Sequence, residues 1–166
     1  MLFRSALTGH LVLSTLHTET AAAAVPRLLD LGVEGFLLRS TLRAVIAQRL
    51  VRVLCNGCKS KHVLTNQDLV ADPRYGVLGL GARETIYRPA GCDSCGGTGY
   101  RGRAGIFELL ELTDEIRPLV GAEADASVID AAAINAGMTT MLDDAVEKCR
   151  AGMTATSEVL RVTSTR

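Results

Sequence analysis

The sequence has no tryptophan, and its aromatic residues amount to 4% of its 166 residues. Its 18 lysines and arginines are balanced by 18 aspartates and glutamates, so the formal net charge is zero. Proteins that bind nucleic acid generally have a basic surface that contacts the phosphates, or exposed aromatic side chains on which the bases stack. The composition therefore argues against nucleic acid as a partner.

Long apolar runs are also missing. No stretch approaches the roughly 20 apolar residues that a membrane-spanning helix needs, although 48% of the residues are hydrophobic. That apolar content is enough for a buried core, and the length fits one domain, or one domain with a small module. The sequence therefore predicts a cytoplasmic protein with no direct membrane span.

Cysteine is the residue type that carries the most information here. Four of the five cysteines form two C-x-x-C pairs, Cys55 with Cys58 and Cys92 with Cys95. This spacing lets both thiolates of a pair reach one ion, and Zn²⁺ is the usual occupant of a set of four sulfur ligands. Four protein sulfurs leave no open position for water, so such a site would be structural. The sequence thus predicts a zinc ion that closes a long loop between the pairs.

Two other interpretations of the cysteines stay open, namely two disulfides or free thiols buried in a core. Disulfides are rare in reducing compartments, and a redox C-x-x-C would need one pair rather than two. Glycines such as Gly57 and Gly91 interrupt or flank the pairs. Tight turns at these glycines are expected to direct backbone N–H groups at the sulfurs. Cys149 stands alone and is expected to pack as a small apolar residue.

The hydrophobic pattern predicts a mixture of helices and strands. A buried strand is expected at 10–16, a helix at 21–31 that Pro26 would kink or shift, and a second helix at 34–54. Arg49 and Arg52 would lie on that second helix, either on a solvated face or facing a partner. Farther along, the pattern predicts a helical turn at 68–71, strands at 85–88 and 104–112, and helices beginning near 114, 127, 140 and 156.

Several segments together resemble the ATPases of type II secretion and type IV pilus assembly. Residues 8–18 resemble that family's histidine box, 47–52 the segment after it, and 99–108 and 152–162 later blocks, while the four paired cysteines match its tetracysteine motif. The resemblance implies an α/β fold, the C-terminal part of a RecA-like P-loop ATPase core with a zinc-stapled loop and a helical C-terminal subdomain. It implies three parts, at 1–54, 55–103 and 104–166.

The chain departs from the family in having no G-x-x-x-x-G-K-[S/T] segment. It therefore lacks the backbone cradle and the lysine that hold the nucleotide phosphates, and the family's Walker B motif is missing as well. We expect a truncated chain that cannot hydrolyse ATP alone. ATP and Mg²⁺ would belong to the complete parent. The resemblance implies that the parent is a hexamer, peripheral to the cytoplasmic face of the inner membrane, acting on secretion or pilus platform proteins.

The resemblance also places His10 and His17 near the nucleotide site. Seven residues apart, the two side chains would lie on opposite faces of an unbroken strand. Judged from the residues alone, without the resemblance, either histidine is interpreted as a hydrogen-bonded core residue. His62 lies in a basic loop and is expected at the surface rather than among the metal ligands. Residues 116–120 resemble a helix that related retraction motors need for mechanical output, or form an ordinary amphipathic helix.

A second function stays open. Residues 92–99 fit C-x-x-C-x-G-x-G, the repeat of the zinc domain in DnaJ-like chaperones, although that domain carries four copies and this chain has one. The alternative is therefore a non-enzymatic zinc-binding module for protein interaction. It would account for the cysteines and leave both ends of the chain unexplained.

Overall fold

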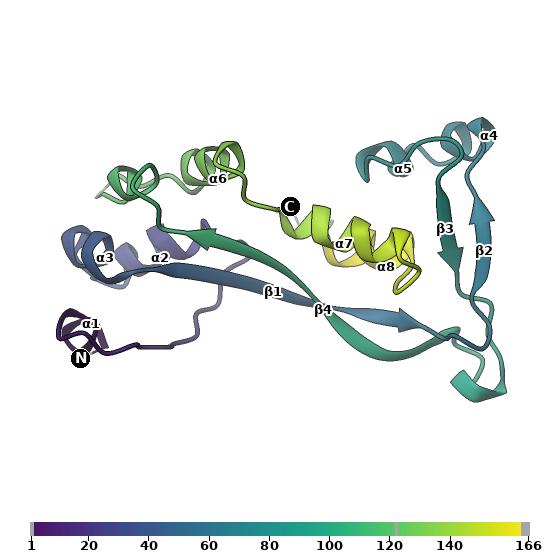
Figure 1. Cartoon of the computed structure of the whole chain (residues 1–166), viewed down its shortest axis with the longest axis horizontal. Helices are drawn as coiled ribbons and strands as arrows, with labels where there is room; N and C mark the ends of the chain where they lie inside the picture. The colour runs from purple at the N-terminus through teal and green to yellow at the C-terminus, as the bar shows by residue number, and fades with distance from the viewer. Residues whose placement is uncertain (1, 122, 164–166) are drawn as a thin grey trace. The chain divides into compact units, whose positions relative to one another are not determined.

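The computed structural model describes residues 2–121 and 123–163 (Figure 1). The chain forms two compact units, the first within residues 1–47 and 108–140 and the second within 48–107 and 141–166. Two long strands, β1 (Ala44–Leu54) and β4 (Tyr100–Glu111), pair with each other and contribute residues to both units. Their arrows point in opposite directions in Figure 1.

The first unit is mainly helical. Its elements are α1 (Leu2–Leu7), α2 (Ala24–Asp30), α3 (Gly35–Thr41), the 3-10 helix η2 (Arg117–Leu119) and α6 (Ala126–Asn135). Val25, Leu38 and Ile129 belong to one buried apolar cluster. Glu108 of β4 is also buried, and its Oε1 accepts a hydrogen bond of 2.6 Å from the backbone N–H of Ala21. This bond satisfies a carboxylate that would otherwise be costly to bury.

The second unit contains the cysteine pairs. Its other elements are β2 (Ser60–Val63), α4 (Asn66–Ala71), α5 (Arg74–Val77), β3 (Thr85–Arg88), the 3-10 helix η1 (Asp93–Cys95), α7 (Met141–Arg150) and α8 (Thr156–Thr163). Strands β2 and β3 pair antiparallel, with Ser60 opposite Arg88. Helix α7 packs against α8 and β3. Leu64, Ile86 and Val159 are fully buried in this unit.

Several predicted elements are confirmed. The strand at 85–88 is β3, the turn at 68–71 lies in α4, and the helices expected near 140 and 156 are α7 and α8. The strand expected at 104–112 falls within β4 except for its last residue. In the described part of the chain, no helix is long and apolar enough to span a membrane.

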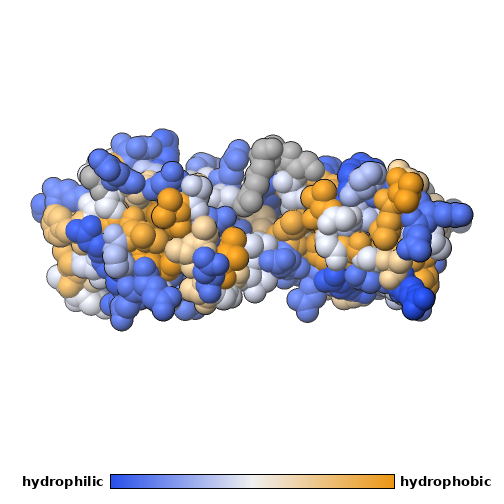
Figure 2. Space-filling view, turned by 90° about the horizontal axis from the view of Figure 1, so that it is seen from above, coloured by the Kyte–Doolittle hydropathy of each residue, from blue (hydrophilic) through white to orange (hydrophobic). Residues whose placement is uncertain are grey.

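The strand predicted at 10–16 is wrong. Residues 10–18 have no regular secondary structure, and none of the described strands pairs with them. Leu11 and Leu13 are 86% and 87% exposed. A buried strand needs neighbours that bond its backbone and cover its side chains, and this segment has neither. Figure 2 shows one face of the molecule, on which exposed apolar patches lie between polar ones.

The helix predicted at 34–54 is wrong beyond Thr41. Helix α3 ends there, and residues 44–54 form β1 instead. Burial along β1 largely alternates from one residue to the next, which is the period of a strand. Val45, Ile46 and Val53 are β-branched and favour this extended state. The spacing of the apolar residues fits a helix as well as a strand, and pairing with β4 selects the strand.

The other helix boundaries shift by a few residues. Helix α2 begins at Ala24, so Pro26 sits in the first turn, where backbone N–H groups have no intrahelical partner. Helix α6 begins at Ala126, one residue before the predicted start, and Asp125 caps it by accepting a hydrogen bond of 2.7 Å from the N–H of Ser127. The helix expected near 114 is the short η2.

The arginines of β1 bind α8 instead of forming a solvated helix face. Arg52 donates to Glu158 twice, from its backbone N–H at 3.0 Å and from Nη2 at 2.6 Å. Arg161 adds two more bonds to the same carboxylate, at 3.0 and 2.9 Å. Arg49 donates to the backbone carbonyl of Val162. Burial opposes the ionisation of Glu158, but the bonds from Arg161 and Arg52 outweigh it and lower its pKa to about 2.

The substitution Glu158→Gln is expected to lower the free energy of unfolding by about 1–2 kcal/mol at neutral pH, because charge-assisted bonds in a buried position are lost. The pKa of Glu158 falls from 4.5 to about 2 on folding, so its stabilisation is complete above about pH 4.5 and is lost as the pH falls toward 2. Urea unfolding between pH 7 and 3 measures both effects. The exposed Glu115→Gln is the control. An unchanged pH slope in Glu158→Gln would contradict this role.

Candidate metal centre

The four paired cysteines converge on one point. The first pair directly follows β1, and Cys92 and Cys95 lie at the start and end of η1, after β3. All four sulfur atoms lie within 4.8 Å of one another. The Sγ atoms of Cys55 and Cys92 are 3.9 Å apart, those of Cys58 and Cys95 are 3.9 Å apart, and those within the second pair are 3.8 Å apart.

These separations fit a tetrahedral metal site. Four sulfurs at about 2.3 Å from a central Zn²⁺ lie about 3.8 Å from one another. A disulfide would bring two sulfurs to about 2.05 Å, and all five cysteines are free thiols. The structure therefore has a cluster that could hold a metal ion, in place of the disulfides that the sequence left open. The other alternative, free thiols buried in a core, does not fit either, because only Cys55 of the four is fully buried.

Backbone N–H groups point at the sulfurs, as the glycine-flanked turns predict. The N–H of Gly91 lies 3.3 Å from Cys58 Sγ, and the N–H groups of Cys92 and Gly99 each lie 3.2 Å from Cys95 Sγ. The bonds from Cys92 and Gly99 lower the pKa of the Cys95 thiol to about 6. Burial raises the pKa of Cys58 to about 11. The turns thus favour a thiolate at Cys95, which is the form that binds metal.

Gly99 connects the two pairs and must be glycine. Its carbonyl accepts a hydrogen bond of 2.9 Å from the N–H of Cys55, while its own N–H faces Cys95. Its φ is +75°, and a Cβ there would lie 2.4 Å from Cβ of Pro89. A larger residue would therefore push apart the two segments that flank the second pair, the end of β3 before Cys92 and the start of β4 after Cys95.

The remaining cysteine and His62 take no part in the cluster. Cys149 is buried in α7, and burial raises its pKa to about 12, so it packs as an apolar residue as expected. His62 is partly exposed and bonds Asp68, with 3.0 Å between Nε2 and Oδ1. Across residues 2–121 and 123–163, the cysteine cluster is the one group of three or more His, Cys, Asp or Glu residues whose ligand atoms come this close.

The structure places His10 and His17 on the exposed segment 10–18, in the first unit. The Nδ1 atom of His10 lies 3.0 Å from the hydroxyl of Thr8. The interpretation of these residues as buried core histidines is therefore wrong. Their role at a nucleotide site stays a prediction.

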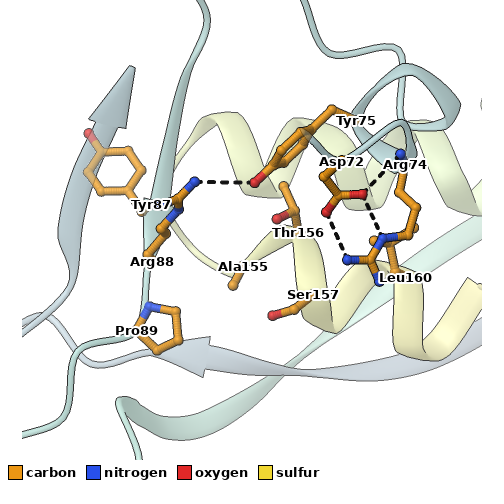
Figure 3. A pocket seen from close by; sticks show the side chains of 10 residues that line it. All are labelled: Asp72, Arg74, Tyr75, Tyr87, Arg88, Pro89, Ala155, Thr156, Ser157 and Leu160. Atoms are coloured by element: carbon orange, nitrogen blue, oxygen red, sulfur yellow. Dashed lines mark hydrogen bonds and ion pairs between the residues drawn. The ribbon is translucent and has the colours of Figure 1, made fainter. Parts of the chain in front are cut away.

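A cavity of about 280 Å³ in the second unit is lined by residues of α5, β3 and α8 (Figure 3). Its arginines are already engaged. Arg74 bonds Asp72 at 2.7 and 2.8 Å, and Arg88 lies 3.4 Å from the hydroxyl of Tyr75. None of the predicted site residues lines this cavity. The cysteine cluster is therefore the candidate functional site.

Sequence reasoning missed the contacts that support the cluster from the C-terminal helices. The N–H of Leu54 donates to the carbonyl of Met153 at 2.8 Å, and Lys59 Nζ donates to the carbonyl of Gly152 at 2.8 Å. About a hundred positions separate these partners in the sequence, so no local spacing signals the contacts. Lys59 could have been singled out only as the residue that follows Cys58.

The chain is similar to a set of secretion proteins over nearly its whole length. It is 43% identical over 160 residues to type II secretion system protein E of Dickeya dadantii. These residues cover 96% of this chain and 31% of the relative. It is 43% identical over 163 residues to type II secretion system ATPase E of Vibrio cholerae, with 96% and 31% covered. It is 43% identical over 161 residues to type IV pilus assembly ATPase PilB of Thermus thermophilus, with 94% and 17% covered.

The chain thus spans about a third of the length of the curated type II relatives named above. The family described as "Type II/IV secretion system protein" matches residues 1–161. This match covers almost the entire sequence, including all four clustered cysteines and both predicted histidines. The chain therefore belongs to the type II/IV secretion system protein family.

Proposed function

We propose that this chain is the C-terminal portion of an ATPase that powers type II protein secretion or type IV pilus assembly. Relatives named for both systems match it at 43% identity, so similarity does not favour one system over the other. The observation that carries the proposal is the convergence of the four cysteines that fit the family's tetracysteine motif. The chain's own part in the motor would be a metal-closed appendage and the helices packed on it.

Zinc is the ion proposed for the cluster. Cys55, Cys58, Cys92 and Cys95 would each supply a thiolate, and a set of four thiolates selects a soft, tetrahedral ion. The ion would close the excursion through β2, α4, α5 and β3, and it would supply folding free energy rather than activate water. The protein's own N–H groups around Cys95 would help to hold the negative charge of the thiolates.

The remaining features of the proposal concern the complete parent protein. Residues 1–54 would complete a RecA-like core, 55–103 would form the zinc loop, and 104–166 would form the C-terminal subdomain. His10 and His17 would lie near ATP and Mg²⁺ once the segment 10–18 has neighbouring strands to pair with. The parent would be a hexamer at the cytoplasmic face of the inner membrane, where it would act on secretion or pilus platform proteins.

Metal analysis of the purified chain is expected to find about one Zn²⁺ per chain. Cys55→Ser and Cys92→Ser are each expected to lose the ion and to lower the free energy of unfolding, because structural zinc contributes directly to folding. Cys149→Ala changes a thiol outside the cluster and should retain the ion. Zinc far below one per chain in protein whose four thiols are reduced and titratable would contradict the assignment.

The isolated chain is expected to show no Mg²⁺-dependent ATP hydrolysis above background, because it lacks a phosphate-binding loop. Phosphate release from purified protein measures this. Turnover that disappears in His17→Ala would overturn the expectation. Suppression of client aggregation by the same preparation would instead favour the zinc-binding interaction module.

A chimera tests the proposed place in a motor. This chain would replace the matching segment of the Vibrio cholerae ATPase E, with which it shares 43% identity. The chimera is expected to retain Mg²⁺-dependent ATPase activity and to support secretion, and its Cys55→Ser form is expected to lose both. The Cys149→Ala form is the matched control. A folded, zinc-loaded chimera without ATPase activity would contradict the proposal.

A further inference from the structure

The turn between α7 and α8 lies against the backbone that leads into and out of the first cysteine pair. Three hydrogen bonds of 2.8 Å connect them. They are Leu54 N–H to the Met153 carbonyl, Thr154 Oγ1 to the Arg52 carbonyl, and Lys59 Nζ to the Gly152 carbonyl. The turn therefore holds the first pair from both sides, before Cys55 and after Cys58.

Lys59 is placed by the same tight turn that places the sulfurs. The N–H of Cys58 donates to the Cys55 carbonyl at 3.1 Å, and the N–H of Lys59 donates to the same carbonyl at 2.9 Å. These bonds fix the backbone from the first thiol to Lys59. A shift of Cys58 away from the cluster would therefore carry the Lys59 side chain away from the α7–α8 turn.

The turn also touches the strand that leads to the second pair. Gly152 is buried and has a φ of +66°, and a Cβ there would lie 2.7 Å from the ring of Tyr87 on β3. Lys59 Nζ lies 5.2 Å from the centroid of the same ring, within the range of a cation–π contact. The turn, Lys59 and Tyr87 thus form one packed group that spans the approaches to both cysteine pairs.

Docking of this turn buries groups that would otherwise be solvated. Thr154 and Ala155 are buried, and Glu158 in the first turn of α8 is 1% exposed. The four sulfurs are free thiols without a covalent bond to hold the two pairs together. An ion bound by all four would hold the two pairs, and with them both surfaces on which the turn packs.

We infer that metal binding at the cysteine cluster and docking of the α7–α8 turn are thermodynamically linked, with Lys59 as the positioning residue that links them. The inference rests on the proposed metal site and goes beyond it, because it adds the α7–α8 turn, which is distant in sequence, to the elements that determine metal affinity. Linkage is reciprocal: if the ion favours the docked turn by some factor, the docked turn raises the affinity for the ion by the same factor.

Hydrogen exchange of the full chain, with Zn²⁺ bound and after chelation, tests the first half of the linkage. The probe reports on amides of residues 141–163. Zinc is expected to slow their exchange by roughly tenfold or more, a coupling within the usual range. The amides of α6 lie in the first unit and serve as the internal reference.

Zinc affinity in Lys59→Met tests the second half. Competition with a chelator is expected to show an affinity lower by about the same factor, while Lys61→Met, which changes an exposed neighbouring lysine, stays at the wild-type value. Gly152→Ala, which acts from the turn side, should weaken zinc in the same direction. A contact that is merely stabilising would lower the unfolding free energy equally in metal-free and zinc-bound protein and leave the affinity unchanged.

The outcomes separate the two proposals. If zinc binds stoichiometrically but exchange in 141–163 does not respond and Lys59→Met matches Lys61→Met, the linkage is wrong and the metal site stands. If the wild-type chain binds no zinc, both are wrong. If Lys59→Met does not fold, the exchange comparison in the wild-type chain still decides the inference.

Discussion

The meeting of two cysteine pairs at one point is the constraint on which the second unit depends. The 33 residues between Cys58 and Cys92 leave the cluster through β2 and return to it through β3. That excursion contains only short elements and a few buried side chains, among them Leu64, Leu78 and Ile86. So small a core does little to offset the entropy of ordering the chain. Bringing both ends of the excursion together adds a further entropic cost, which the free energy of metal binding at the cluster would offset.

A second constraint ties the cluster to the end of the chain. Arg52 lies three residues before Cys55 and binds Glu158 through both its backbone and its side chain. The guanidinium also lies 4.2 Å from the ring centroid of Tyr100, at the start of β4. A carboxylate buried in α8 is thus satisfied by the same segment that presents the first thiol. The position of the thiol and the packing of the last helix are consequences of one set of contacts.

The sequence alone predicted what depends on local chemistry. Cysteine spacing identified the cluster, since two residues between thiols is the geometry one ion needs. The hydrophobic pattern predicted the starts of α7 and α8 to within one residue. The predictions from sequence were wrong where pairing with a distant segment decides whether a strand forms. The span 44–54 has apolar residues at both helical and strand spacing, and only pairing with β4 selects the strand. Residues 10–16 have strand composition without a partner strand in the described part of the chain.

The contacts that support the cysteine cluster were not predictable for the same reason. Lys59 and Gly152 meet across 93 positions, and neither belongs to a recognisable spacing. Gly152 could be interpreted from the sequence only as the end of a helix. Its contact with the ring of Tyr87, which requires the absence of a side chain, becomes visible only in three dimensions.

The burial of Cys149 has a practical consequence for sulfur chemistry in this chain. With its pKa raised to about 12 and its side chain enclosed in α7, this thiol is almost never ionised at neutral pH. Alkylating reagents attack thiolates, so in the folded chain they would find their targets only at the paired cysteines. Labelling of this protein with such reagents would therefore report on the four clustered thiols, without a contribution from Cys149.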